Sequence, residues 1–260
     1  YANYRITEDG VPHELKVPSN KIKLVRGFDI NAGETTELIL DFDAAKSVVK
    51  AGKEKNNKGA KWILKPTIKV LGQYALIHGT VSDSNGGLPD ALVSAQYNDE
   101  TDTLTIAAAT VSEDTGKYTM FVDPGTYNVV AYAAGYDPQC IFGDTDAPPN
   151  AGLTADFTLI ANATGATLTG NVSIIGDEAD EQVVNISVRK LLPCSDTPVE
   201  ILSQQVTEGS SYSFNLPAIS ADAPAEEKYT VVASSIGEET QVSEEIALPD
   251  GDTVTIDFTF

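Results

Sequence analysis

Few residues in this sequence have the type and spacing that chemistry requires. The 260 residues include two histidines, His13 in VPHELKVP and His78 in IHGTV, and neither lies beside a nucleophile motif. There is no G-x-S-x-G, H-E-x-x-H or phosphate-binding loop, the patterns typical of serine hydrolases, zinc proteases and nucleotide sites. We therefore predict no catalytic residue, no cofactor and no metal ligand, and we expect a protein that is not an enzyme.

The two cysteines, Cys140 and Cys194, are 54 residues apart, a separation that fits no C-x-x-C metal or redox motif. The spacing leaves three arrangements open: a disulfide between two domains, a link to a partner, and free buried thiols. We favour the disulfide because the rest of the sequence indicates an extracellular protein, in which disulfides persist.

Aspartates recur in turn-like segments and could supply oxygen ligands to Ca²⁺. None of these segments has the twelve-residue spacing with a terminal Glu, and ordinary turn chemistry explains Asp, Asn and Gly equally well. We assign no ligand there. The segments are Asp83–Gly86, Asn98–Asp102, Asp144–Asp146 and Asp250–Asp252.

Charge divides the chain near residue 70. The whole chain has 38 acidic and 17 basic side chains, a net charge of −21, but residues 1–70 carry 13 basic and 9 acidic groups, a net of +4. The remainder has a net charge of −25, which disfavours binding to nucleic acid or to anionic membranes. The basic segment Lys50–Lys61 is either a solvated hairpin tip or a surface that docks on an acidic neighbour.

The elements that must position these residues are strands. Short alternating runs rich in Val, Ile, Thr and Tyr are separated by Gly, Pro, Asn and Asp, which is typical of antiparallel sandwiches. The best helical candidate is only Asp43–Lys50. No apolar run approaches 18 residues, so we expect a soluble chain whose signal or anchor segment lies outside it. The predicted fold class is all-β, a string of antiparallel β-sandwich domains with an incomplete N-terminal β module.

Residues 74–260 contain an internal repeat. IHGTV resembles LTGNV, KYTMFV resembles SYSFNL, and ADFTLI resembles IDFTF, with offsets that grow along the chain and thus indicate loop insertions such as 217–227. The aligned positions include Ile77 with Leu168, Tyr118 with Tyr212, Tyr127 with Tyr229, and Phe157 with Phe258.

The first copy resembles the carboxypeptidase regulatory-like, prealbumin-type sandwich. That family's pattern is G-x-V, a small-residue strand, G-x-Y-x-F, P-G-x-Y, A-x-G-Y and a closing D-F-x-L, and residues 74–160 carry nearly all of it. Residues 165–260 resemble it less, because the P-G-x-Y turn and the Gly-Tyr pair are lost. The resemblance implies an extracellular or periplasmic spacer, adhesion or assembly module without catalysis.

Residues 1–70 resemble the C-terminal half of a domain of unknown function from secreted and lipoprotein-type prokaryotic proteins. The resemblance rests on FDINAGETTEL, LDFDA and WILKPTIKV. The N-terminal half expected of that domain does not occur in this sequence, so the chain is a fragment or a neighbour supplies the missing strands. The predicted domains are 1–71, 72–161 and 162–260.

Two covalent modifications could occur in modules of this kind, an isopeptide bond and N-glycosylation. A Lys–Asn isopeptide bond, known in Gram-positive pilus sandwiches, is not expected because the first copy's one lysine, Lys117, lies in mid-domain. Three N-x-S/T sequons, at Asn162, Asn171 and Asn185, are a weak indication of glycans.

These observations favour an extracellular or cell-surface structural protein. We expect the incomplete N-terminal module to associate head-to-tail with further copies or with other surface proteins by strand complementation, forming a filament or surface layer. The segments 35–42 and 62–71 are the expected edges. The alternative is a carbohydrate- or protein-binding accessory module of a larger secreted protein, which would use exposed coplanar aromatics among Trp62, Tyr97, Tyr132 and Tyr136.

Overall fold

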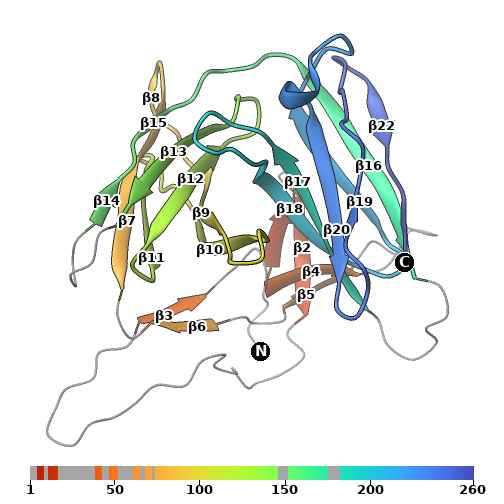
Figure 1. The fold of residues 1–260 in the computed structure, drawn as a ribbon, viewed down its shortest axis with the longest axis horizontal. Coiled ribbons are helices and arrows are strands. Elements are labelled where there is room, and N and C mark those ends of the chain that lie inside the picture. The colour runs from red at the N-terminus through yellow and green to blue at the C-terminus, as the bar shows by residue number, and fades with distance from the viewer. Residues whose placement is uncertain are drawn as a thin grey trace, which may run out of the picture.

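The computed structural model describes residues 5–8, 11–16, 39–42, 47–51, 61–64, 68–71, 74–145, 152–174 and 182–260. The secondary structure of these residues consists almost entirely of strands, so the predicted all-β class is confirmed. Two sandwiches lie side by side, and the N-terminal strands lie below and between them in the view of Figure 1. In this described part of the chain, no helix is long and apolar enough to cross a membrane.

The first sandwich places one sheet, in the order β10-β9-β12-β13, over a second sheet, in the order β11-β7-β14. Two short strands, β8 and β15, also pair with β7. The strands are β7 (Ala75–Asp83), β8 (Gly86–Gly87), β9 (Leu92–Asn98), β10 (Leu104–Val111), β11 (Lys117–Val122), β12 (Thr126–Tyr132), β13 (Gln139–Asp144), β14 (Gly152–Thr154) and β15 (Phe157–Thr158).

The second sandwich has the same topology. One sheet has the order β18-β17-β20-β21 and the other the order β19-β16-β22, with β23 also on β16. A short 3₁₀ helix, Ala225–Glu227, lies inside the 217–227 insertion. The strands are β16 (Gly165–Ser173), β17 (Val183–Lys190), β18 (Val199–Thr207), β19 (Ser211–Pro217), β20 (Tyr229–Ser235), β21 (Gln241–Val242), β22 (Thr253–Thr255) and β23 (Phe258–Thr259).

Aligned residues of the repeat make the same contacts in both sandwiches. The Tyr118 hydroxyl donates to the Ala155 carbonyl at 2.5 Å, and the Tyr212 hydroxyl donates to the Ile256 carbonyl at 2.5 Å. Their ring centroids lie 6.4 Å from Phe157 and from Phe258, respectively. The two copies of the repeat therefore agree in individual hydrogen bonds as well as in strand order.

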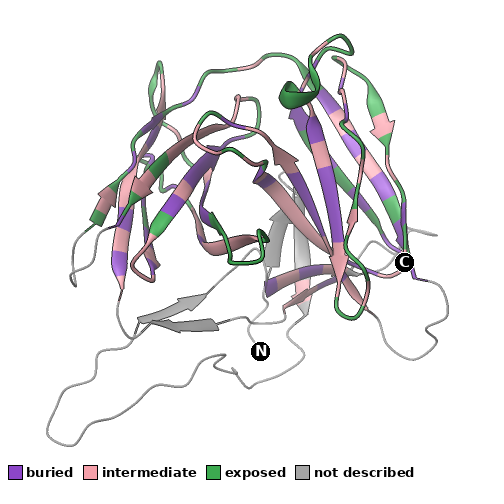
Figure 2. Cartoon of the chain, in the orientation of Figure 1, coloured by how far each residue is buried: buried purple, intermediate pink, exposed green. Residues whose placement is uncertain are grey.

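The period of two in the sequence separates core from surface on each strand. Ile77 and Val81 of β7 are buried, and so are Leu168 and Val172 of β16, whereas the alternate positions His78, Thr80, Thr169 and Asn171 are half-buried or exposed. Figure 2 shows this alternation of buried and exposed positions along both sandwiches. Burying the inner rows between two sheets is the main stabilising contribution to each module.

The N-terminal strands extend a sheet of the second sandwich. One sheet of eight strands has the order β1-β2-β5-β4-β18-β17-β20-β21, and β3 pairs with β6 in a separate two-stranded sheet. The strands are β1 (Arg5–Glu8), β2 (Val11–Lys16), β3 (Ile39–Phe42), β4 (Val48–Ala51), β5 (Lys61–Leu64) and β6 (Ile68–Leu71).

Strand β4 attaches this N-terminal group in parallel to β18, with Val49 beside Gln205 and Lys50 beside Val206. The helix expected over 43–50 is therefore wrong at 48–50, because Val48, Val49 and Lys50 pair with β5, and Val49 and Lys50 also pair with β18. Residues 43–46 and the middle of the basic segment, 52–60, lie outside the described residues. Lys50 Nζ lies 5.4 Å from the Trp62 ring.

Candidate functional site

The two histidines lie on separate strands, His13 on β2 and His78 on β7. His78 on β7 is half-buried, with its Nε2 atom 3.4 Å from the Thr154 hydroxyl. His13 belongs to β2, and its side chain lies outside the described part of the structure. In the described ranges, no three His, Cys, Asp or Glu side chains gather as a metal would require.

The aspartates of the turn segments use their oxygens to close turns. Asp83 accepts hydrogen bonds from the backbone N–H groups of Asn85 at 2.7 Å and Gly86 at 3.1 Å, and from the Tyr136 hydroxyl at 2.9 Å. These bonds, chiefly the one from Asn85, lower the pKa of the Asp83 carboxyl. Asp99 similarly accepts from Thr101 and Thr103, and its pKa is lowered as well. Turn chemistry therefore accounts for these two segments, while Asp146 lies outside the described residues.

The four aromatics considered for carbohydrate binding do not form a platform. Trp62 and Tyr132 are buried, and the Tyr136 hydroxyl is engaged by Asp83. Tyr97 is the most exposed of the four, at 37%, and it packs edge-on against Tyr127 with ring centroids 5.9 Å apart.

The most distinctive site is the contact between the two sandwiches, which we call the joint. Cys140 of β13 and Cys194 of the β17–β18 loop form a disulfide with Cα atoms 5.7 Å apart. Of the three arrangements that the sequence left open, the structure has the disulfide between the modules. It ties the β17–β18 loop of the second sandwich to the outer face of the first.

An apolar cluster fills the joint beside the disulfide. On β12, Val129 and Ala131 point into the first sandwich's own core, while Val130 and Tyr132 point outward. The outward pair packs on residues of the second sandwich and its loop: Leu192, Val199 and Ile201. Burial on both faces explains why β12 reads TYNVVAY, a nearly continuous apolar run.

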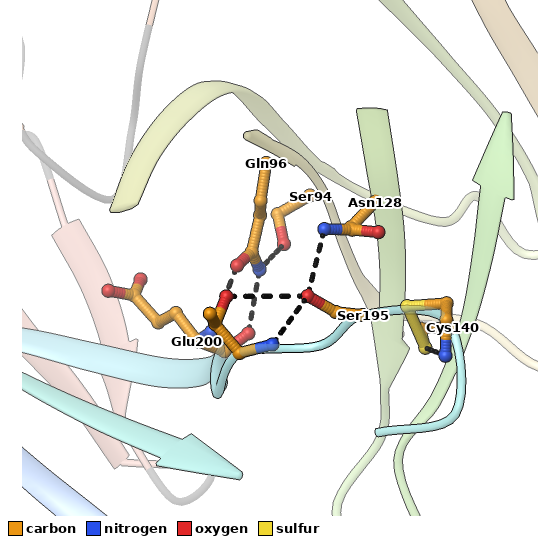
Figure 3. Close-up of a disulfide and its surroundings, with 8 residues drawn as sticks. Ser94, Gln96, Asn128, Cys140, Ser195 and Glu200 are labelled. Carbon is orange, nitrogen blue, oxygen red and sulfur yellow. Dashed lines mark hydrogen bonds between the residues drawn. A yellow bond between two sulfur atoms is a disulfide. The ribbon is translucent and has the colours of Figure 1, made fainter. Parts of the chain in front are cut away.

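Gln96 makes the central polar contact of the joint. Its side chain is fully buried, and its Nε2 atom donates to the Glu200 carbonyl at 2.7 Å while its Oε1 atom accepts from the Glu200 N–H at 2.9 Å. Figure 3 shows this amide reaching from β9 to the backbone of Glu200, with Ser94 also accepting from Nε2 at 2.8 Å. The side-chain amide thus pairs with the β18 edge as a neighbouring strand would.

Hydrogen bonds from Asn98, Asn128 and Tyr132 also cross the joint. Asn98 Nδ2 donates to the Thr197 hydroxyl at 2.9 Å, and Asn128 Nδ2 donates to the Ser195 hydroxyl at 3.3 Å. The hydroxyl of Tyr132 donates to the backbone carbonyl of Asn215 at 3.0 Å. Burial raises the pKa of Tyr132 to about 12, so this donor stays protonated at neutral pH.

Sequence reasoning missed Gln96, although a signal was present. LVSAQYN places a long polar side chain in a strand of small and apolar residues, where a buried amide must find partners. The partner could not be read from the sequence because Glu200 lies 104 positions away.

The family comparisons agree with the two resemblances. Residues 76–160 match the carboxypeptidase regulatory-like domain. This domain is a non-catalytic fold. Residues 1–66 match DUF4382, a domain of unknown function. No curated protein matches the sequence.

Solved structures share only a weak likeness with the chain. The Bacillus anthracis TIE protein is 15% identical with a TM-score of 0.29, covering 76% of this chain, which spans 35% of that protein. The shaft pilin SpaA from Lactobacillus rhamnosus GG is 10% identical, with a TM-score of 0.30 and coverage of 72% and 98% of the two chains. A DUF3823 family protein from Parabacteroides merdae is 11% identical, with a TM-score of 0.29 and coverage of 68% and 98%. Scores this low carry no conclusion about function.

Proposed function

We propose that this protein is an extracellular or cell-surface structural protein whose two sandwiches act as one stiff unit. The joint is the observation that carries this proposal. A spacer must resist bending between its modules, and here a disulfide, an apolar cluster and the buried Gln96 amide all span the same contact. A chain that only needed two tethered domains would not require a buried contact of this kind.

The disulfide also supports the proposed location. Disulfides form and persist in oxidising compartments such as the cell exterior and the bacterial periplasm, and they are rare in the cytosol. The strongly acidic surface, net −25 beyond residue 70, favours solubility there.

The finer proposal is that copies assemble head-to-tail by strand exchange. The β18 edge accepts β4 through two residue pairs, Val49–Gln205 and Lys50–Val206. A contact this short is suited to exchange, because the same strand of a neighbouring copy can replace it without changing the pairing. Opposite net charges on residues 1–70 and on the rest of the chain would guide one copy to the next.

An engineered cross-link tests this assembly. Val49→Cys with Gln205→Cys places two thiols on directly paired residues of β4 and β18. After oxidation at several protein concentrations, a strand exchanged between copies gives a ladder of covalent oligomers on non-reducing gels, and electron microscopy of the same material shows fibres. The single variant Val49→Cys is the control, since one added thiol links no more than two chains.

The cross-link has one contrary outcome. If every concentration gives only an internally linked monomer, β4 stays on its own β18 and the assembly proposal is wrong. The stiff-unit proposal is independent of that result, because the joint lies within one chain.

A further inference from the structure

We infer that a groove at the joint binds a neutral saccharide. The inference goes beyond the proposed structural role and rests on the joint's geometry. The cross-strand register places Gln96, Asn128 and Phe142 directly opposite one another on β9, β12 and β13, so all three point to the outer face of the first sandwich. Along this row burial decreases from the fully buried Gln96 to Phe142, which is 62% exposed.

The groove opens where this row emerges from beneath the second sandwich. Its volume is about 390 Å³, within the range of small-molecule sites. The outer face of the first sandwich forms the floor, with Asn98, Thr126, Asn128 and Phe142, and the 194–197 loop forms a wall. The disulfide fixes that wall, because Cys194 is part of it.

The groove presents an exposed ring surrounded by amide, hydroxyl and carboxylate groups. Phe142, 62% exposed, offers an aromatic surface to the C–H groups of a sugar ring. Asp102 and Asp196 accept hydrogen bonds, and Thr126 both donates and accepts. The groove lining contains no Lys or Arg, which disfavours an anionic ligand.

Asn128, paired with Phe142 on the neighbouring strand, has unused hydrogen-bonding capacity. Its Nδ2 atom donates to Ser195, but its buried Oδ1 atom accepts no hydrogen bond within the described structure. Buried acceptors of this kind cost free energy until a donor reaches them. In Figure 3, Asn128 lies between the Gln96 contact and the disulfide. A rotation of this amide toward the groove would bring an acceptor to a sugar hydroxyl, and the ring and the amide together suit a ligand with both apolar and hydroxyl faces.

The second sandwich provides a matched control. Its equivalent of β13 is β21 (Gln241–Val242), a strand without an aromatic residue, where Val242 is 63% exposed. Phe142→Ala and Val242→Ala therefore remove similar exposed apolar groups, one inside the groove and one outside it.

A glycan array carrying neutral and acidic glycans tests the inference with the intact, oxidised protein. We expect binding to neutral glycans that Phe142→Ala weakens at least tenfold and Val242→Ala leaves unchanged, with circular dichroism showing that both variants are folded. An array without neutral hits, or hits that persist in Phe142→Ala, would overturn it. NMR titrations of isotope-labelled protein distinguish a saccharide from a cationic partner. If a lysine hexapeptide shifts the amide signals of Asn128 and Ser195 and the array's glycans do not, the groove binds a cationic partner instead.

Discussion

Replacing Gln96 by Leu should destabilise the protein far more than the same change elsewhere on the first sandwich. Leucine has a similar size but cannot pair with Glu200, so both the N–H and the C=O of Glu200 lose their partners in a buried setting. Each unsatisfied group costs about 1–3 kcal/mol, and leucine returns part of this as apolar burial. We expect a net loss of about 3 kcal/mol in the free energy of unfolding.

The control is Gln139→Leu. Gln139 Nε2 makes one exposed hydrogen bond, to the Thr158 carbonyl at 2.8 Å, and the half-buried Gln139 directly precedes Cys140 on β13, so its side chain lies on the opposite face of the strand from the joint. Its loss should cost below about 1 kcal/mol, because water can replace the lost partner. Equilibrium urea unfolding followed by circular dichroism measures both variants against the unaltered chain.

The same assay in a disulfide-free background tests whether Gln96 acts through the joint. With Cys140→Ser and Cys194→Ser the joint can open and let water reach Glu200, so the cost of Gln96→Leu should fall to about 1 kcal/mol. The coupling between the two changes would then be about 2 kcal/mol. Equal costs for Gln96→Leu and Gln139→Leu, or no coupling with the disulfide, would refute this reasoning.

Three other predictions concern a buried glycine, two buried tyrosines and the disulfide. A Cβ atom on Gly170 would overlap the Ile256 carbonyl, whereas a Cβ atom on Gly165 would have its nearest neighbour 3.6 Å away. Thermal melting should therefore show that Gly170→Ala lowers the free energy of unfolding by at least about 2 kcal/mol and that Gly165→Ala leaves it almost unchanged. Burial raises the pKa values of Tyr127 and Tyr132 to about 12. The free energy of unfolding should therefore stay constant below the tyrosine pKa of the unfolded chain, near 10, and should fall as the pH rises toward 12. Tyrosinate absorbance should increase together with unfolding and not before it. Removing the disulfide, which closes a loop of 54 residues, should lower the unfolding free energy by about 4 kcal/mol in the chain-entropy model; a calorimetric loss below about 1 kcal/mol would contradict that model here.

The sequence predicted the parts of the fold that local pattern determines. Alternation gave the strands, and the aligned Tyr118 and Tyr212 indicated a repeat whose hydrogen bonds prove equivalent. These features lie within one sandwich and recur in the family pattern, so a single sequence is enough to recognise them.

The joint was harder to predict because its contacts join residues far apart in the chain. The cysteine spacing allowed a disulfide without deciding for it, and Gln96 could not be assigned to a partner 104 positions away. The placement of β4 beside β18 was missed for a different reason. Residues 43–50 have a composition that suits a short helix, and only pairing with strands from elsewhere makes 48–50 extended.

The stiffness of the two-sandwich unit can be measured directly by backbone ¹⁵N relaxation on the oxidised protein. We expect residues 75–145 and 182–260 to report one shared rotational correlation time, and we expect the Cys140→Ser, Cys194→Ser variant with Gln96→Leu to report two shorter ones. Two separate, shorter correlation times in the unaltered protein would contradict the proposal that the joint makes the sandwiches one structural unit.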